Sequence, residues 1–142
     1  MIAAYKKLIQ PPLELIEERV IATTTTQYRQ RSANFRDSVL AAHSAECQVC
    51  GMKIQQLIEA AHIVPVASNG IDHESNGIPL CPTHHSAFDW HLFAFEPVSK
   101  LIIIRPGFYA SGLGITKTNL LANVSDEALR IRHALFENSN QG

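Results

Sequence analysis

The chain has 142 residues with a formal net charge of −1 and 46% hydrophobic residues, values typical of one ordinary globular domain with a single core. The near-neutral charge excludes a uniformly basic nucleic-acid-binding surface, so any such surface must be local. The sequence has no run of about 18 apolar residues and no secretory signal pattern, which predicts a cytoplasmic protein that does not enter a membrane.

Helical patterns dominate the N-terminal third of the sequence. Residues 12–22, "PLELIEERVIA", have apolar residues at helical spacing and a proline suited to a first turn. The next stretch, "TTTTQYRQR", contains poor helix formers, and we expect a connection or an extended arm there. A second helix is expected over residues 32–43, with Ser32 as its cap. Three apolar residues share one face of it: Phe35, Val39 and Leu40.

The central part of the chain predicts shorter elements. The segment "LIEAAHIVPV" is typical of a short strand that ends in a turn at Pro65. A polar loop, "ASNGIDHESNG", follows with two Asn-Gly turn signals. After it, "THHSAFDWH" predicts a short helix, and "LFAFE" with "KLIIIRP" predicts a β-hairpin. We expect Phe88 and Trp90 to be core residues that hold the short helix against the hairpin.

The last expected element is a helix over "SDEALRIRHALF", with Ser125 as its cap and two carboxylates in its first turn. We divide the chain into an N-terminal helix and arm over residues 1–30, a core over 31–105 and a C-terminal extension with one helix over 106–142.

Cysteine spacing indicates a metal site. Three cysteines cannot form a closed set of disulfides, and thiols in a reducing compartment often bind metal. "CQVCG" and "CPTH" are two knuckles about 30 residues apart, and together they offer three thiolates and one imidazole, which suit tetrahedral zinc. We predict a structural Zn²⁺ bound by Cys47, Cys50, Cys81 and His84. The alternative is that the cysteines are only small buried residues.

Two adjacent histidines, His84 and His85, are expected to have different roles. Neighbouring side chains on a regular backbone diverge, so His85 points away from a zinc ion bound by His84. Asp89 stands four residues later on the same helical face, and the pair could reach a second, hard cation or a phosphate. Alternatively, His85 only caps the helix and Asp89 only bonds to a backbone amide.

The sequence places His62 in "EAAHIVP" and Asn76 and His85 in "NGIPLCPTHHSAFD". The order of these three polar residues resembles the HNH endonuclease family, in particular its restriction-type branch. Both knuckles and the hairpin belong to the same pattern. The resemblance covers about residues 30–105. It implies an α+β fold with a zinc-stapled ββα-metal core, flanking helices and a following β-hairpin. It also implies cleavage of DNA phosphodiester bonds around one catalytic divalent ion, Mg²⁺, Mn²⁺ or another.

The resemblance also implies roles for individual residues. His62 matches the general base that activates water, and Asn76 matches the asparagine that holds the loop in shape. His85 matches the metal-binding histidine, and Asp89 falls where some relatives place another ligand. The products implied are a 5′-phosphate and a 3′-hydroxyl.

One position departs from the family pattern. Ala61 precedes the base, where many relatives have an aspartate or histidine ligand, and alanine cannot bind metal. The ion would then be held by His85, Asp89, water and the DNA phosphate, with Glu59 as an outside candidate. This departure leaves room for a weak or inactive site.

Arg29, Arg31 and Arg36 form the densest cationic stretch, which predicts either phosphate contact or a solvated helix face.

The favoured function is a metal-dependent DNA endonuclease connected with restriction or mobile-element defence. The first alternative is a catalytically degenerate zinc module that binds nucleic acid or protein. The second, hydrolysis at the knuckle zinc, is disfavoured because four ligands leave no open position. The sequence leaves the oligomeric state open, a dimer included.

Overall fold

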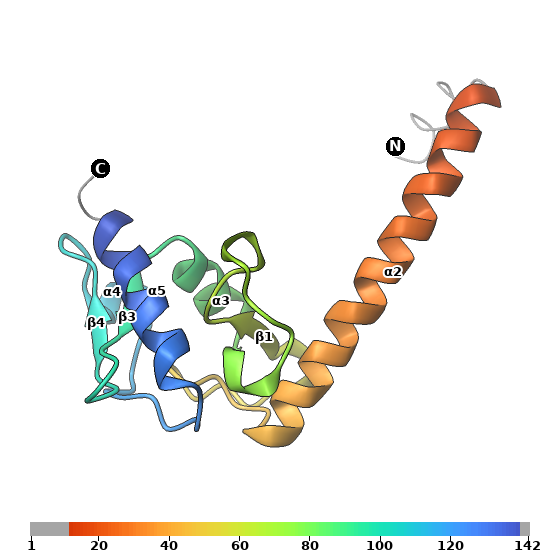
Figure 1. The fold of residues 1–142 in the computed structure, drawn as a ribbon. Helices are drawn as coiled ribbons and strands as arrows, with labels where there is room; N and C mark the ends of the chain where they lie inside the picture. The colour runs from red at the N-terminus through yellow and green to blue at the C-terminus, as the bar shows by residue number, and fades with distance from the viewer. Residues whose placement is uncertain (1–11, 140–142) are drawn as a thin grey trace. The chain divides into compact units, whose positions relative to one another are not determined.

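The computed structural model describes the backbone of residues 12–139 and the side chains of residues 25–139. The chain divides before Phe35 into two compact units. The first unit contains most of the long helix α2 (Pro12–Ala42). The second contains the end of α2 and the other helices and strands that the structure describes (Figure 1). None of the helices between residues 12 and 139 carries an apolar stretch long enough to cross a lipid bilayer.

Helix α2 is continuous from Pro12 to Ala42, so the expectation of an arm over the threonine run was wrong. Ser32 lies inside this helix and therefore cannot cap it. Threonine costs only a fraction of a kcal/mol relative to alanine in a helix, and the sequence between Pro12 and Ala42 has no glycine or further proline to end it.

The end of α2 packs on the start of strand β2. Phe35 and Val39 are buried, as their spacing predicted. A Cβ atom added at Gly77 would lie 2.3 Å from Cγ2 of Val39 and 2.9 Å from Cζ of Phe35. Only glycine allows this close approach of helix and strand.

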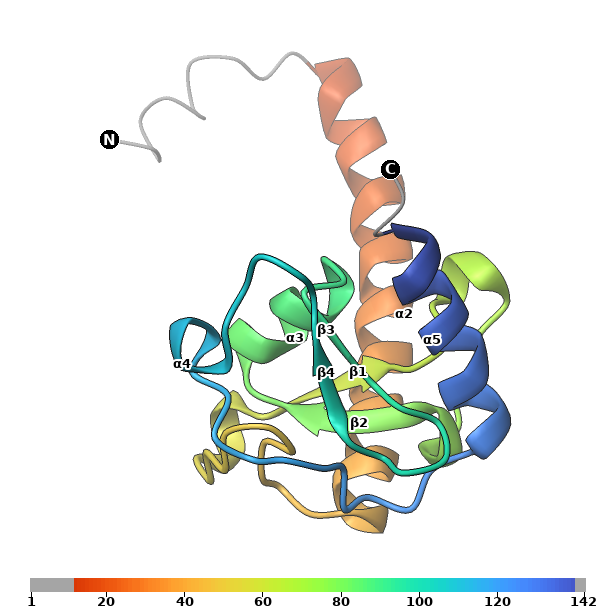
Figure 2. The same cartoon turned by 90° about the vertical axis from the view of Figure 1, so that its left-hand side faces the viewer.

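Two strands and a helix form the central motif. Strand β1 (Glu59–His62) pairs antiparallel with β2 (Gly77–Leu80), so that His62 lies opposite Gly77. Helix α3 (Pro82–Asp89) follows at once and packs against both strands (Figure 2). Pro82 occupies the first turn of α3, where its missing N–H has no partner to lose. This order confirms the expected ββα core.

The remaining elements cover this core. Strands β3 (Phe93–Phe95) and β4 (Ile102–Ile104) form the expected antiparallel hairpin. The short helix α4 (Ala110–Leu113) follows, and α5 (Asp126–Ser139) packs against β3. The Ser125 hydroxyl accepts a 3.1 Å hydrogen bond from the Ala128 amide, which confirms the expected cap. Three short 3-10 turns link these elements: η1 (Gln55–Leu57), η2 (Val66–Ser68) and η3 (Glu74–Asn76).

The two aromatic residues expected in the core have different environments. Phe88 is fully buried, and its ring centroid lies 5.4 Å from that of Phe93 and 5.9 Å from that of Phe95. Trp90 is 76% exposed, so the expectation that it packs in the core was wrong. Residues two apart on a helix face opposite sides, and therefore Phe88 and Trp90 cannot both face the hairpin.

Candidate active site and metal centre

The cysteine knuckles meet in one cluster. The ligand atoms of Cys47, Cys50, Cys81 and His84 all lie within 4.8 Å of one another. Nδ1 of His84 is 3.1 Å from Sγ of Cys81 and 3.7 Å from Sγ of Cys47, and the Sγ atoms of Cys50 and Cys81 are 4.0 Å apart. A zinc ion about 2.3 Å from each sulfur would separate its tetrahedral ligands by about 3.8 Å. These four residues could therefore hold a zinc ion.

A backbone contact orients the imidazole of this cluster. Nε2 of His84 donates a 2.7 Å hydrogen bond to the carbonyl oxygen of Leu113 in α4. This contact leaves Nδ1 as the ring nitrogen that faces the sulfur atoms, and Nδ1 would be the ligand atom once a metal ion replaced its proton. Helix α4, which follows the hairpin, thus orients one of the four residues of the cluster.

The charges of the cluster favour a bound cation. Burial raises the pKa of the Cys47 thiol, but hydrogen bonds from His84 and from backbone amides outweigh it and bring the pKa down to about 6. Burial, followed by the neighbouring Cys47 and Cys81, raises the pKa of Cys50 to about 12. Thiolates this close repel one another, and a divalent ion among them would remove that repulsion.

Asn76 fixes the loop between β1 and β2. Its side chain is almost fully buried, and Oδ1 accepts a 2.8 Å hydrogen bond from the amide of Val64. Nδ2 donates to the carbonyl oxygens of Val64 at 3.1 Å and of Ile71 at 3.0 Å. One amide group therefore joins both ends of the loop that follows His62.

His62 ends β1 and is held on two sides. Its ring stacks on Phe35, with centroids 4.0 Å apart and an interplanar angle of 11°. Nε2 forms a 2.8 Å hydrogen bond with Oδ1 of Asp72, which comes from the polar loop. Sequence reasoning missed Asp72, because no spacing rule places a loop carboxylate against a strand residue ten positions earlier.

The two candidate ligands on α3 lie beside each other. Nε2 of His85 is 3.5 Å from Oδ2 of Asp89, as their separation of four residues predicted. The other ring nitrogen, Nδ1, forms a 2.7 Å hydrogen bond with Oε1 of Glu59. In this geometry Nε2 and Oδ2 are the atoms available to a cation, and Glu59 orients the ring.

Ala61 is fully buried, in keeping with a position that faces α3 rather than solvent. Glu59 lies two residues earlier and so projects from the same face of β1. Its carboxylate reaches the site from that face, although Ala61 itself contributes no polar atom. The alternation of side chains along the strand was the signal in the sequence for the contact between Glu59 and His85.

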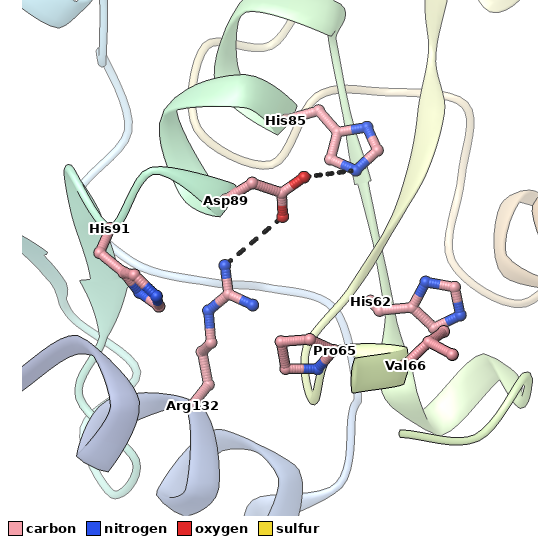
Figure 3. Close-up of a pocket in the computed structure, with 7 residues that line it drawn as sticks. All are labelled: His62, Pro65, Val66, His85, Asp89, His91 and Arg132. Atoms are coloured by element: carbon pink, nitrogen blue, oxygen red, sulfur yellow. Dashed lines mark ion pairs between the residues drawn. The ribbon is translucent and has the colours of Figure 1, made fainter. Parts of the chain in front are cut away.

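A pocket of about 290 Å³ connects these groups (Figure 3). Its lining contains His62, Pro65, Val66, His85, Asp89, His91 and Arg132. Three residues singled out from the sequence, His62, His85 and Asp89, therefore share one pocket. Arg132 of α5 was missed, since it stands in a part of the chain where no motif was recognised.

The three arginines of the cationic stretch belong to two different units of the chain, Arg36 to the second and the other two to the first. The Arg36 guanidinium donates to the carbonyl oxygen of Ile58 at 2.8 Å and to that of Gln55 at 2.7 Å, so it supports the segment before β1. Arg29 and Arg31 belong to the first unit of the chain, and their contact with DNA stays a prediction.

Comparison with known proteins identifies the motif. Residues 47–96 match the model of the HNH endonuclease family. The chain is also similar to the solved structure of a modification-dependent TagI restriction endonuclease, at 24% identity and a TM-score of 0.55. That match covers 72% of this chain and 37% of the other, and it shows a shared fold. No curated protein sequence matches the chain. The similarity to HNH endonucleases therefore lies in residues 47–96, which contain strands β1 and β2, helix α3 and the cysteine cluster.

Proposed function

We propose that this protein is a metal-dependent endonuclease that hydrolyses phosphodiester bonds in DNA. The observation that carries the proposal is the pocket in which His62 of β1 lies together with His85 and Asp89 of α3. An imidazole that can act as a base, beside two groups that can bind a divalent ion, is one arrangement able to hydrolyse a phosphodiester bond.

In this proposal His62 is the general base. Asp72 occupies its Nε2, so Nδ1 is the nitrogen that takes the proton from the attacking water. The carboxylate of Asp72 then stabilises the imidazolium ion that forms, while Phe35 holds the plane of the ring. Asn76 keeps the loop that carries Asp72 in place.

His85 and Asp89 would hold the catalytic ion, Mg²⁺, Mn²⁺ or another divalent cation. Ligands about 2.1 Å from an ion are about 3.0 to 3.4 Å apart in octahedral and tetrahedral sites, close to the 3.5 Å between Nε2 and Oδ2. When bound, such an ion stabilises negative charge on the scissile phosphate and on the departing 3′-oxygen. Products with a 5′-phosphate and a 3′-hydroxyl follow from that polarity.

The cluster of Cys47, Cys50, Cys81 and His84 is proposed to bind a structural Zn²⁺. Its four ligands leave no open position for a substrate, so the ion stabilises the fold. We assign nuclease function to residues 31–105, with Leu113 and Arg132 contributed by the extension after them.

A role in restriction or in defence against mobile elements is proposed from the similarity to a restriction enzyme. That role would place the protein in the cytoplasm with the DNA that it cuts. The buried Ala61 favours one other candidate, a degenerate domain that binds nucleic acid or protein without cleavage.

Supercoiled plasmid DNA incubated with the purified protein and a panel of divalent ions tests the proposal. We expect nicked or linear product with at least one ion and none with a chelator. His62→Ala should lower the cleavage rate on the order of a hundredfold or more with unchanged circular dichroism, because general-base catalysis typically contributes that much. Binding of DNA without cleavage under every ion would instead favour the degenerate domain.

A further inference from the structure

Arg132 is the buried charge of the active-site pocket. It lies on α5, outside the residues that match the family model, and is only 3% exposed. Nη2 donates to the carbonyl oxygen of Phe88 at 2.6 Å, and Nη1 donates to that of Ile63 at 3.2 Å. Nη2 also lies 3.6 Å from Oδ1 of Asp89, and Cζ stands 3.9 Å from the centroid of the Phe88 ring.

The cost of this burial indicates a role beyond packing. Removing a guanidinium from water is unfavourable unless its donors are paired, and Nε of Arg132 has no hydrogen-bond partner among the described residues. A leucine or methionine would cover Phe88 without these penalties.

The guanidinium of Arg132 bonds to backbone next to the proposed base and next to the proposed metal ligand. Ile63 directly follows His62, and Phe88 directly precedes Asp89. Arg132 therefore bridges the chain next to the proposed base and the chain next to the proposed metal ligand, as Figure 3 shows for its contact with Asp89. Its charge also lies at the C-terminal end of α3, where the helix dipole favours a cation.

We propose that Arg132 is a positioning residue that orients Asp89 for metal binding and fixes the separation of Asp89 from His62. The proposal rests on the function proposed above. Arg132 holds Oδ1 of Asp89 and leaves Oδ2 beside His85, just as Glu59 holds one nitrogen of His85 and leaves the other beside Asp89. Each of the two metal ligands thus has a partner from another element of the fold, α5 for Asp89 and β1 for His85.

Arg132→Lys and Arg132→Gln separate positioning from packing. Lysine keeps the charge and glutamine keeps an amide donor, but each has a single nitrogen and cannot reproduce the planar guanidinium, whose Nη1 and Nη2 reach separate carbonyl oxygens. The matched control is Arg130→Gln, an exposed residue of the same helix whose ion pair is with Glu127. Variants are compared after zinc content and circular dichroism have shown which of them are folded.

Two measurements are made on each folded protein. Titration with Mn²⁺ in the absence of DNA, followed by electron paramagnetic resonance, should show about 10- to 100-fold weaker binding in the Arg132 variants, as for other groups that orient metal ligands. Plasmid cleavage at saturating Mn²⁺ should show a lower kcat with little change in KM. Arg130→Gln should match the wild type in both.

Wild-type Mn²⁺ affinity and kcat in a folded Arg132 variant would overturn the proposal, whatever its melting temperature, and so would a wild-type protein that binds no Mn²⁺. A wild-type protein that cleaves no DNA, yet binds Mn²⁺ with an affinity that depends on Arg132, would overturn the nuclease function and support positioning. The two failures are therefore distinguishable.

Discussion

Glu59 and His85 are joined by a hydrogen bond of 2.7 Å that links β1 to α3. It occupies Nδ1 of His85, whereas Nε2 of the adjacent His84 is occupied by the Leu113 carbonyl. The two neighbouring histidines therefore present opposite ring nitrogens, His84 toward the thiols and His85 toward Asp89. Their different surroundings provide a physical basis for the division of roles that the sequence suggested.

Replacing Glu59 should weaken the catalytic site without unfolding the protein. Glu59→Ala removes the group that orients His85, so we expect Mn²⁺ affinity and cleavage rate to fall about 10- to 100-fold. Glu59→Gln should have an intermediate effect, because its amide oxygen can still accept the Nδ1 hydrogen bond. Glu127→Gln on α5 is the control, since the Glu127 side chain is exposed and has no part in the proposed site. Equal activity of Glu59→Ala and the wild type would contradict the proposed orientation.

Alanine at the two adjacent histidines should cause two different defects. His84→Ala removes a ligand of the zinc cluster, so zinc content and melting temperature should fall, and activity should fall as the fold is lost. His85→Ala should keep zinc and stability but lose cleavage, because the ion at the scissile phosphate would lack a ligand. Metal analysis, thermal melting and plasmid nicking on the same samples measure these effects.

His84→Cys is the matched variant for this comparison. Thiolate also suits zinc, so the substitution should preserve folding and much of the activity. If His85→Ala loses zinc, or His84→Ala keeps it with full stability, the roles of the two histidines must be reassigned.

Asn76 should be important for stability as well as for the site. Its side chain makes three hydrogen bonds to backbone groups, each contributing about 0.5 to 1.5 kcal/mol. Asn76→Ala should therefore lower the free energy of unfolding by about 2 to 4 kcal/mol, measured by urea denaturation. Asn123→Ala, at an exposed position, should change it little. A loss under about 0.5 kcal/mol would mean that the loop does not depend on these bonds.

The core motif could be predicted because short-range patterns determine it. The paired knuckles indicated which segments meet, and the spacing of His85 and Asp89 placed them on one helical face. The expectation of an arm over the threonine run was wrong because the low helix propensity of single residues does not end a helix that has no internal glycine or proline. The expectation that Trp90 is buried was wrong because it ignored the direction of a side chain two positions after Phe88, at the C-terminal end of α3.

Two contacts of the site could not be predicted from local patterns. Asp72 meets His62 only because the loop folds back under the control of Asn76. Arg132 meets Asp89 only because α5 packs beside the hairpin, 43 positions along the chain from that carboxylate. Such contacts depend on tertiary packing, and no helical or strand period in the sequence encodes them.

The hydrogen bond between Asp72 and His62 yields the last prediction. Asp72→Asn keeps an oxygen that can accept from Nε2 but removes the negative charge that stabilises the imidazolium ion. Asp72→Ala removes both the charge and the bond, so His62 should lose its fixed orientation as well. We therefore expect kcat to fall in the order wild type, Asp72→Asn, Asp72→Ala, with a total loss of roughly 10- to 100-fold, smaller than that of His62→Ala.

Because the Asp72 side chain is about one-third exposed, these variants should keep their zinc and most of their stability. Asp37→Asn, at a strongly exposed carboxylate, is the matched control and should cleave DNA at the wild-type rate. In the His62→Ala background the Asp72 substitutions should have no further effect on kcat, because a group that acts through the imidazole cannot act once the imidazole is gone. A full additional loss in the double variant would show that Asp72 contributes to cleavage by a route that does not involve His62.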